Sequence, residues 1–274
     1  MTAVATAREA ELADSLARVR ERLDRAADAA NRAVEEIELL PITKFFPASD
    51  VLILSNLGCR AFGESREQEA AAKSVECDSL GAPGPIRWHM VGRIQRNKAR
   101  SIAGWAYAAH SVDSARLITA LGRACGRALS DGERAEPLRV YIQISLDGDV
   151  DRGGVDIGRP DEIDEVCGLA DAAEALRFVG LMAIPPLGSD PDVEFARLQA
   201  ELRRVQADYQ HRLELSAGMS GDLEAAVEHG STCVRVGTAL MGQRPLTSPP
   251  VVTPVTSSSQ TPALQEGSSD EHTA

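Results

Sequence analysis

Lysine is scarce in this chain of 274 residues, which carries 29 basic residues. Only Lys44, Lys73 and Lys98 are lysines, and the other basic residues are arginines. A guanidinium effectively never loses its proton, so an arginine cannot form an imine with an aldehyde. A lysine retained in such a sequence therefore hints that an amine is needed at its position, although a genomic preference for arginine gives the same pattern.

The sequence also lacks Cys and His residues at the spacing of metal ligands, and it has no long apolar run and no excess of positive charge. The five cysteines are scattered, which is typical of reduced thiols in an intracellular protein. No segment approaches the length of a membrane span or a signal peptide, so we expect a cytoplasmic protein without a membrane anchor. A net charge of −12 and an aromatic content of 4 % argue against nucleic-acid binding, because phosphates would be repelled and stacking surfaces are scarce.

Hydrophobic periodicity predicts alternating strands and helices. A long amphipathic helix is expected over residues 8–34, where apolar residues recur at steps of three and four. The strand-like runs that follow are 37–43, 60–63, 87–91, 106–110, 138–145, 177–183, 213–216 and 233–236. The helical segments between them are 48–57, 65–76, 94–103, 113–129, 160–174, 191–212 and 221–229.

This alternation favours an α/β fold, a single (β/α)8 TIM barrel with an extra N-terminal helix. Strict β/α alternation implies a parallel sheet with helical crossovers, and eight such units suit a closed barrel. A doubly wound open sheet is the alternative, since short strands are easily miscounted. We assign residues 1–245 to the barrel. Residues 246–274 are rich in Pro, Ser and Thr, so we expect a disordered tail, with a regulatory phosphorylated tail as the alternative.

Lys44 stands directly after the first expected strand, in the stretch ELLPITKFFP. Active sites of such barrels lie at the C-terminal ends of the strands, where this side chain would be. Desolvation beside Phe45 and Phe46 would favour the neutral, nucleophilic form of an amine. The alternative is a solvated charge at a strand end.

The loops after the last two expected strands are rich in small residues. LSAGMSGD contains Ser216 and Gly218, and VRVGTAL places Gly237 and Thr238 just past the eighth strand. The loops after strands 7 and 8 are the recurrent phosphate site of these barrels, and free amides at helix N-termini suit a dianion. We therefore expect a phosphate group to bind here.

Arg235 alternates with Val234 and Val236, so it points into the barrel if the valines face the helices. A buried arginine needs a partner, and an internal carboxylate such as Glu64 is one alternative. Combined with a lysine and a phosphate cradle, however, an inward arginine suits pyridoxal 5′-phosphate (PLP), whose ring nitrogen needs a partner. A guanidinium there disfavours a protonated pyridinium, so carbanion chemistry would be poorly supported.

At these residues the sequence resembles the pyridoxal phosphate homeostasis protein family, whose barrel is similar to the N-terminal domain of alanine racemase. The resemblance is collinear over about residues 8–244 and is carried by WHMVGRIQRNKARSI, HSVDS, LMAIP, LSAGMSGDLEAAVEHGST and VRVGTALMGQR. It implies a monomeric barrel that holds PLP as a Schiff base. The residues aligned with the cofactor site are Lys44, Ser216, Gly237, Thr238 and, at the ring nitrogen, Arg235.

The resemblance implies a non-catalytic PLP carrier in vitamin B6 homeostasis, with PLP-dependent apoenzymes as recipients. The alternative is an amino-acid racemase, and racemases of this fold add a β domain that supplies a catalytic tyrosine. We expect the ordered chain to end near residue 245, and Tyr107, Tyr141 and Tyr209 do not occupy the expected place, so we expect no enzyme. Four positions depart from the family pattern and affect the finer lining of the pocket: Ser65, Arg66, Arg152 and Ala217.

Overall fold

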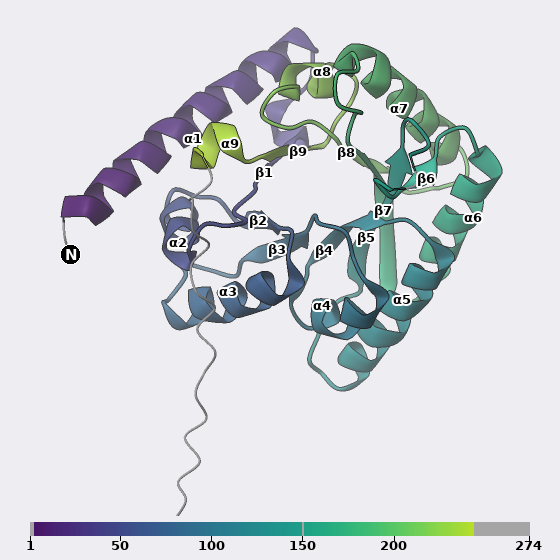
Figure 1. The fold of residues 1–274 in the computed structure, drawn as a ribbon, viewed down its shortest axis with the longest axis horizontal. Coiled ribbons are helices and arrows are strands. Elements are labelled where there is room, and N and C mark those ends of the chain that lie inside the picture. The colour runs from purple at the N-terminus through teal and green to yellow at the C-terminus, as the bar shows by residue number, and fades with distance from the viewer. Residues whose placement is uncertain (1–2, 150, 244–274) are drawn as a thin grey trace, which may run out of the picture.

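A computed structural model describes residues 3–149 and 151–243, with side chains from residue 7 onward. It begins with helix α1 (Ala3–Ala29), which lies beside the barrel wall (Figure 1). This helix ends earlier than periodicity predicts because Asn31 takes a left-handed backbone conformation, with a φ of 53°. The expected tail over residues 246–274 lies outside the described residues, so it stays a prediction.

Eight parallel strands form a closed barrel, in the order β1-β9-β8-β7-β5-β4-β3-β2 around the sheet (Figure 1). A parallel bridge between Ile42 and Gly63 joins the chain just past the first strand to the second and completes the circle. The (β/α)8 prediction is therefore confirmed, and the open-sheet alternative is wrong. The strands are β1 (Glu38–Pro41), β2 (Ala61–Glu64), β3 (Arg87–Met90), β4 (Ala108–Val112), β5 (Leu138–Ser145), β7 (Leu176–Ala183), β8 (Glu214–Ser216) and β9 (Cys233–Val236).

Helices surround the ring of strands on the outside (Figure 1). They are α2 (Ala48–Asn56), α3 (Glu67–Ser79), α4 (Ala99–Trp105), α5 (Ala115–Ser130), α6 (Pro160–Asp171), α7 (Pro191–Gln206), α8 (Leu223–Glu228) and α9 (Thr238–Met241), with 3-10 turns η1 (Val34–Glu36) and η2 (Arg96–Lys98). Two elements were not predicted, the single-turn helix α9 and the two-residue strand β6 (Val155–Asp156), which pairs with β5. Neither is long enough to show a periodic pattern.

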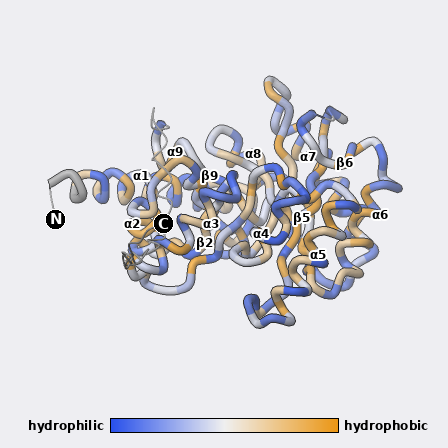
Figure 2. The backbone as a smooth tube through the Cα atoms, turned by 60° about the horizontal axis from the view of Figure 1, so that its bottom comes forward, coloured by the Kyte–Doolittle hydropathy of each residue, from blue (hydrophilic) through white to orange (hydrophobic). Residues whose placement is uncertain are grey.

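The apolar core lies between the strands and the helices. Val234 and Val236 of β9 pack in one cluster with Leu12 and Leu16 of α1, and these leucines are almost fully buried. Burying each such side chain contributes about 2 kcal/mol, so α1 is an integral part of the barrel wall. Apolar residues also concentrate along β5 and α5 (Figure 2).

The barrel interior, in contrast, is polar at several levels. Because successive strand residues point to opposite faces, Arg235 points inward while its valine neighbours face the helices, as the alternation predicts. Buried polar side chains inside the barrel include His89, His110 and Ser216. Within residues 3–149 and 151–243, no helix combines the length and the apolar character that a membrane crossing requires.

Candidate functional site

Lys44 lies in a tight turn immediately after β1, at the C-terminal end of the barrel, and its side chain is half-buried. The turn is closed by a hydrogen bond from the Phe46 amide to the Thr43 carbonyl, with an N–O distance of 3.1 Å. Phe45 within the turn has a φ of 71°, an uncommon conformation for a bulky residue. Such backbone costs about 1–3 kcal/mol and clusters at functional sites, so this turn has the character of a binding element.

A buried ion pair between Lys73 and Glu64 holds the start of the turn in place. The Lys73 ammonium lies 2.6 Å from Glu64 Oε1 and donates to the Thr43 carbonyl at 3.0 Å. Thr43 Oγ1 donates to the same carboxylate oxygen at 2.8 Å. Burial raises the pKa of Glu64, while Lys73 and Thr43 oppose that rise. Lys73 is therefore committed to a structural carboxylate. Since Glu64 pairs with Lys73, the alternative pairing of Glu64 with Arg235 is wrong.

Arg235 instead makes hydrogen bonds to neutral partners on the neighbouring strands. Its Nη1 donates to Ser216 Oγ at 2.6 Å, and its Nη2 donates to the Ala183 carbonyl at 2.9 Å. Burial lowers the pKa of Arg235 from its ordinary value. The structure therefore places Ser216 beside this guanidinium, where its hydroxyl orients the arginine.

Two histidines continue this hydrogen-bond chain through the barrel. His110 Nδ1 lies 2.8 Å from Ser216 Oγ, and His110 Nε2 lies 2.9 Å from His89 Nδ1. Burial lowers the pKa of His89 to about 3 and that of His110 well below its usual value, so both rings are neutral at pH 7. Sequence reasoning assigned these histidines no role, because only the barrel register brings them together with Ser216.

The small-residue loops meet at the same end of the barrel as Lys44. Gly218 has a φ of 90°, and a Cβ there would lie 2.5 Å from the Cβ of Ala226, so only glycine fits. Its carbonyl accepts a hydrogen bond from the Arg235 amide at 2.9 Å. Ser220 Oγ in the same loop accepts from the Ala239 amide at 3.2 Å, which ties the loop after β8 to helix α9.

Strand register brings the last loop to the lysine turn. β1 pairs with β9, with Pro41 opposite Val236, and the Ile42 amide donates to the Val236 carbonyl at 2.9 Å. Gly237 and Thr238 follow directly, at the start of α9. A Cβ on Gly237 would lie 3.6 Å from Ile42 Cβ, an ordinary van der Waals contact, which shows that the two segments are adjacent. The predicted lysine, arginine and small-residue loop are thus brought together at neighbouring strand ends.

Two of the departures from the family pattern line this end of the barrel. The Arg66 guanidinium lies 5.1 Å from the centroid of the Phe45 ring, within cation–π range. Arg152 forms an ion pair with Asp147 at 2.8 Å and also donates to the Pro185 carbonyl. Within the described part of the chain, no group of His, Cys, Asp or Glu is arranged to hold a metal ion.

The fold is a (β/α)8 barrel in which the lysine turn and the small-residue loops lie at the C-terminal ends of the strands. Residues 14–245 match the family described as alanine racemase, N-terminal domain. The chain belongs to this family, in its branch of pyridoxal phosphate homeostasis proteins.

The relatives have a similar length and fold. The pyridoxal phosphate homeostasis protein of Mycobacterium tuberculosis is 61% identical over 88% of this chain and 96% of its own. The structure of PipY from Synechococcus elongatus with PLP bound has a TM-score of 0.71 and 31% identity, covering 85% of this chain and all of that one (100%). Alanine racemase of Bartonella henselae shares the fold, with a TM-score of 0.58 and 15% identity, over 86% of this chain but 61% of its own.

Proposed function

We propose that this protein binds PLP as a Schiff base on Lys44 and serves PLP homeostasis without catalytic turnover. The observation that carries the proposal is the parallel pairing of β1, which leads to Lys44, with β9, which carries Arg235 and leads to Gly237. PLP needs an amine for its aldehyde, amides and hydroxyls for its phosphate, and a partner for its ring nitrogen. The relatives named for PLP homeostasis, and PipY with PLP bound, support the same function.

The residues present fit the cofactor. Gly218, Gly237 and Thr238 lie on small-residue loops whose backbone allows close approach, and they would receive the phosphate. Arg235, oriented by Ser216, would face the ring nitrogen. Bound PLP would supply an electrophilic aldehyde, and the protein's contribution is to hold and orient it.

The absence of turnover is supported by where the tyrosines lie. Tyr141 donates a hydrogen bond to Glu214 near the opposite end of the barrel, and the Tyr107 ring lies within cation–π range of two arginines at that same end. Tyr209 packs against Phe178 among the surrounding apolar residues. None of the three lies at the lysine turn. A guanidinium at the ring nitrogen would also make PLP a weak electron sink.

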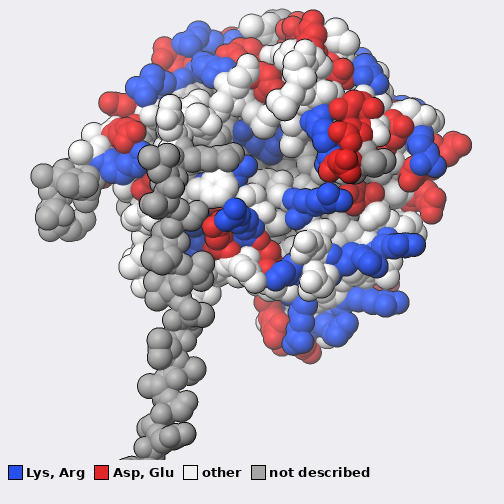
Figure 3. Space-filling model, viewed as in Figure 1, with Lys and Arg blue, Asp and Glu red and all other residues white. Residues whose placement is uncertain are grey.

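We also propose that the protein acts as a cytoplasmic monomer and passes PLP to PLP-dependent apoenzymes. The cysteines at 59, 77, 125, 167 and 233 are all free and buried, which suits a reducing compartment. Acidic and basic side chains are interspersed on the face shown in Figure 3. Such a mixed surface favours neither nucleic acid nor an anionic membrane as a partner.

The test is the visible absorption spectrum of purified protein with PLP, before and after borohydride reduction. Wild type is expected to show an imine band that reduction abolishes, and Lys44→Ala is expected to lack it. Lys98→Ala is the matched control, because Lys98 forms an ion pair with Glu67. An imine band retained in Lys44→Ala would refute the proposal. PLP-dependent isomerisation of alanine by wild type would favour the racemase alternative.

A further inference from the structure

A cavity opens at the end of the barrel opposite to Lys44, where the strands begin. It has a volume of about 600 Å³, within the range of sites for small molecules. We call it the floor cavity, and its lining includes Glu38, Arg87, His89, Arg139, Tyr141 and Glu214. None of these residues belongs to the site proposed for PLP.

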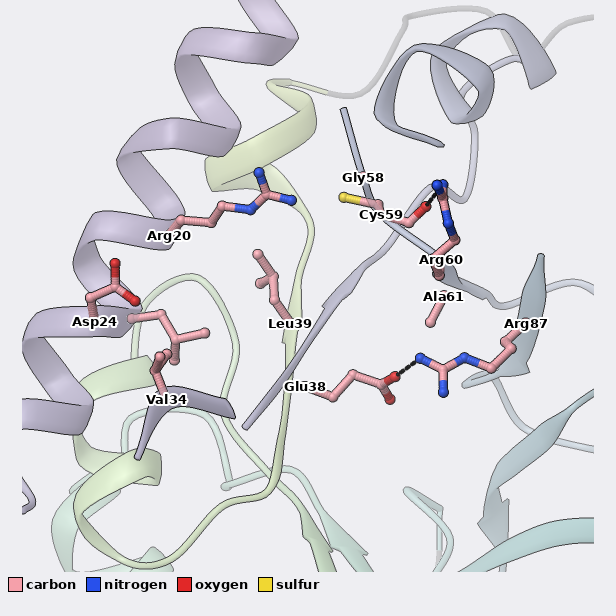
Figure 4. A pocket seen from close by; sticks show the side chains of 11 residues that line it. Arg20, Asp24, Val34, Glu38, Leu39, Gly58, Cys59, Arg60, Ala61 and Arg87 are labelled. Atoms are coloured by element: carbon pink, nitrogen blue, oxygen red, sulfur yellow. Dashed lines mark hydrogen bonds and ion pairs between the residues drawn. The ribbon is translucent and has the colours of Figure 1, made fainter. Parts of the chain in front are cut away.

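The lining of the floor cavity contains acidic and basic side chains, which form two ion pairs. Glu38 pairs with Arg87 across 2.6 Å, as Figure 4 shows from the neighbouring cavity, and Arg139 pairs with Glu214 across 2.5 Å. The guanidinium carbons of Arg87 and Arg139 lie 5.4 and 5.5 Å from the centroid of the Tyr107 ring. Each ion pair engages only part of a five-donor guanidinium, so both arginines retain N–H groups for a further acceptor.

His89 is the feature that these pairs do not explain. Its ring is 2 % exposed and lines the cavity, yet its Nε2 has no hydrogen-bond partner among the described residues. Buried polar atoms nearly always have a partner, so an unpaired nitrogen at a cavity wall indicates a group supplied from the cavity.

The hydrogen-bond chain sets which way this nitrogen acts. Arg235 can only donate, so Ser216 Oγ accepts from it and has its own proton to give to His110. His110 Nε2–H can then donate to His89 Nδ1, which leaves the buried Nε2–H of His89, on a ring that lines the cavity, as a donor without a partner among the described residues. In this assignment every ring or hydroxyl proton of the hydrogen-bond chain from Ser216 to His89 has an acceptor, except the Nε2 proton of His89.

The charges that bear on His89 are positive. Burial lowers the pKa of His89, and Arg87 and Arg139 lower it further. A neutral N–H donor between two guanidiniums favours a carboxylate oxygen. Glutamates in the same lining favour a cationic group next to that carboxylate.

We propose that the floor cavity binds a small zwitterion of the α-amino acid class. Its carboxylate accepts a hydrogen bond from His89 Nε2 between Arg87 and Arg139, and its ammonium faces Glu38 and Glu214. This site is independent of Lys44, so it goes beyond the proposed function.

The test is calorimetric titration of L-alanine into the Lys44→Ala protein, in which the amino acid cannot react at the lysine. Saturable binding is expected, and propionate or ethylamine, which each carry one of the two charges, should bind at least about tenfold more weakly. Arg139→Gln and His89→Phe should each weaken binding by about tenfold or more, the worth of a charge-assisted hydrogen bond. Arg159→Gln is the matched control, because Arg159 forms an exposed ion pair with Glu162 away from the cavity.

The proposal is overturned if L-alanine shows no saturable binding, or if Arg139→Gln and His89→Phe, shown to be folded by thermal melting, bind like their parent. Binding confined to protein that carries PLP on Lys44 would place the amino acid at the other end of the barrel and would also overturn it. If wild type with PLP shows no imine band while L-alanine binding is retained, the result would count against the proposed PLP function alone.

Discussion

Replacing Lys73 by methionine isolates the buried pair that supports the lysine turn. Glu64 is fully buried, and Lys73 Nζ lies 2.6 Å from its carboxylate. Without the ammonium, Glu64 has to be either a lone buried anion or protonated. Keeping it protonated at pH 7, above its ordinary pKa of 4.5, costs about 3.4 kcal/mol, because each pH unit is worth about 1.4 kcal/mol. The same protonation costs about 0.7 kcal/mol at pH 5.

Lys73→Met should therefore lose about 3 kcal/mol of unfolding free energy at pH 7 and much less at pH 5, as measured by urea denaturation at both pH values. The sign follows from linkage. A carboxyl whose folded pKa is raised supports folding at low pH, and that support is lost as pH rises through the folded pKa. In the control, Glu64→Gln is added to Lys73→Met. It should restore most of the stability and remove the pH dependence, because the neutral amide still accepts from Thr43.

The double variant also separates stability from cofactor binding. Lys73 Nζ holds the Thr43 carbonyl, one residue before Lys44, and the added amide does not replace that bond. PLP binding, followed by the imine band, should stay weakened in the double variant while its stability recovers. A Lys73→Met protein with unchanged stability, or with the same loss at pH 5 and pH 7, would refute the reasoning about the buried pair.

Three further substitutions test other parts of the site. Gly218→Ala should cost about 1–3 kcal/mol in chemical denaturation and reduce PLP retention, because of its positive φ and the contact with Ala226, whereas Gly221→Ala should be nearly neutral. Wild-type stability should fall as pH drops from about 6.5 towards 3, since the folded pKa of His89 lies at about 3; His89→Phe should flatten that slope in a series of melting curves. Arg235→Met should leave the PLP-free protein as stable as wild type or more so, yet shrink the rise in melting temperature that PLP produces.

The sequence predicted the barrel well because its longer helices are periodic over several turns and short apolar, β-prone runs alternate regularly with them. The predicted end of the first helix was wrong because one residue, Asn31, decides where the helix stops. Short elements such as β6 were missed because two residues show no hydrophobic periodicity. Lys44 and Arg235 are far apart in the chain, and their strands lie side by side only because the first strand of the barrel pairs with the last. Partners inside the barrel were the least predictable part. Glu64 has two basic residues to choose from, and only the packed structure shows that it takes Lys73.

The buried charge of Arg235 supports a role for this protein in carrying PLP without catalysis. Its direct partners are a hydroxyl and a carbonyl, and no carboxylate within the described residues forms a hydrogen bond with it. Burying a guanidinium without a counter-ion costs free energy that the fold alone does not recover. A bound dianionic cofactor would compensate that charge, so the cost paid in the empty protein becomes affinity for PLP. The same guanidinium charge opposes protonation of the ring nitrogen, because two adjacent cations repel. One residue would therefore strengthen the hold on the cofactor and weaken its use as an electron sink.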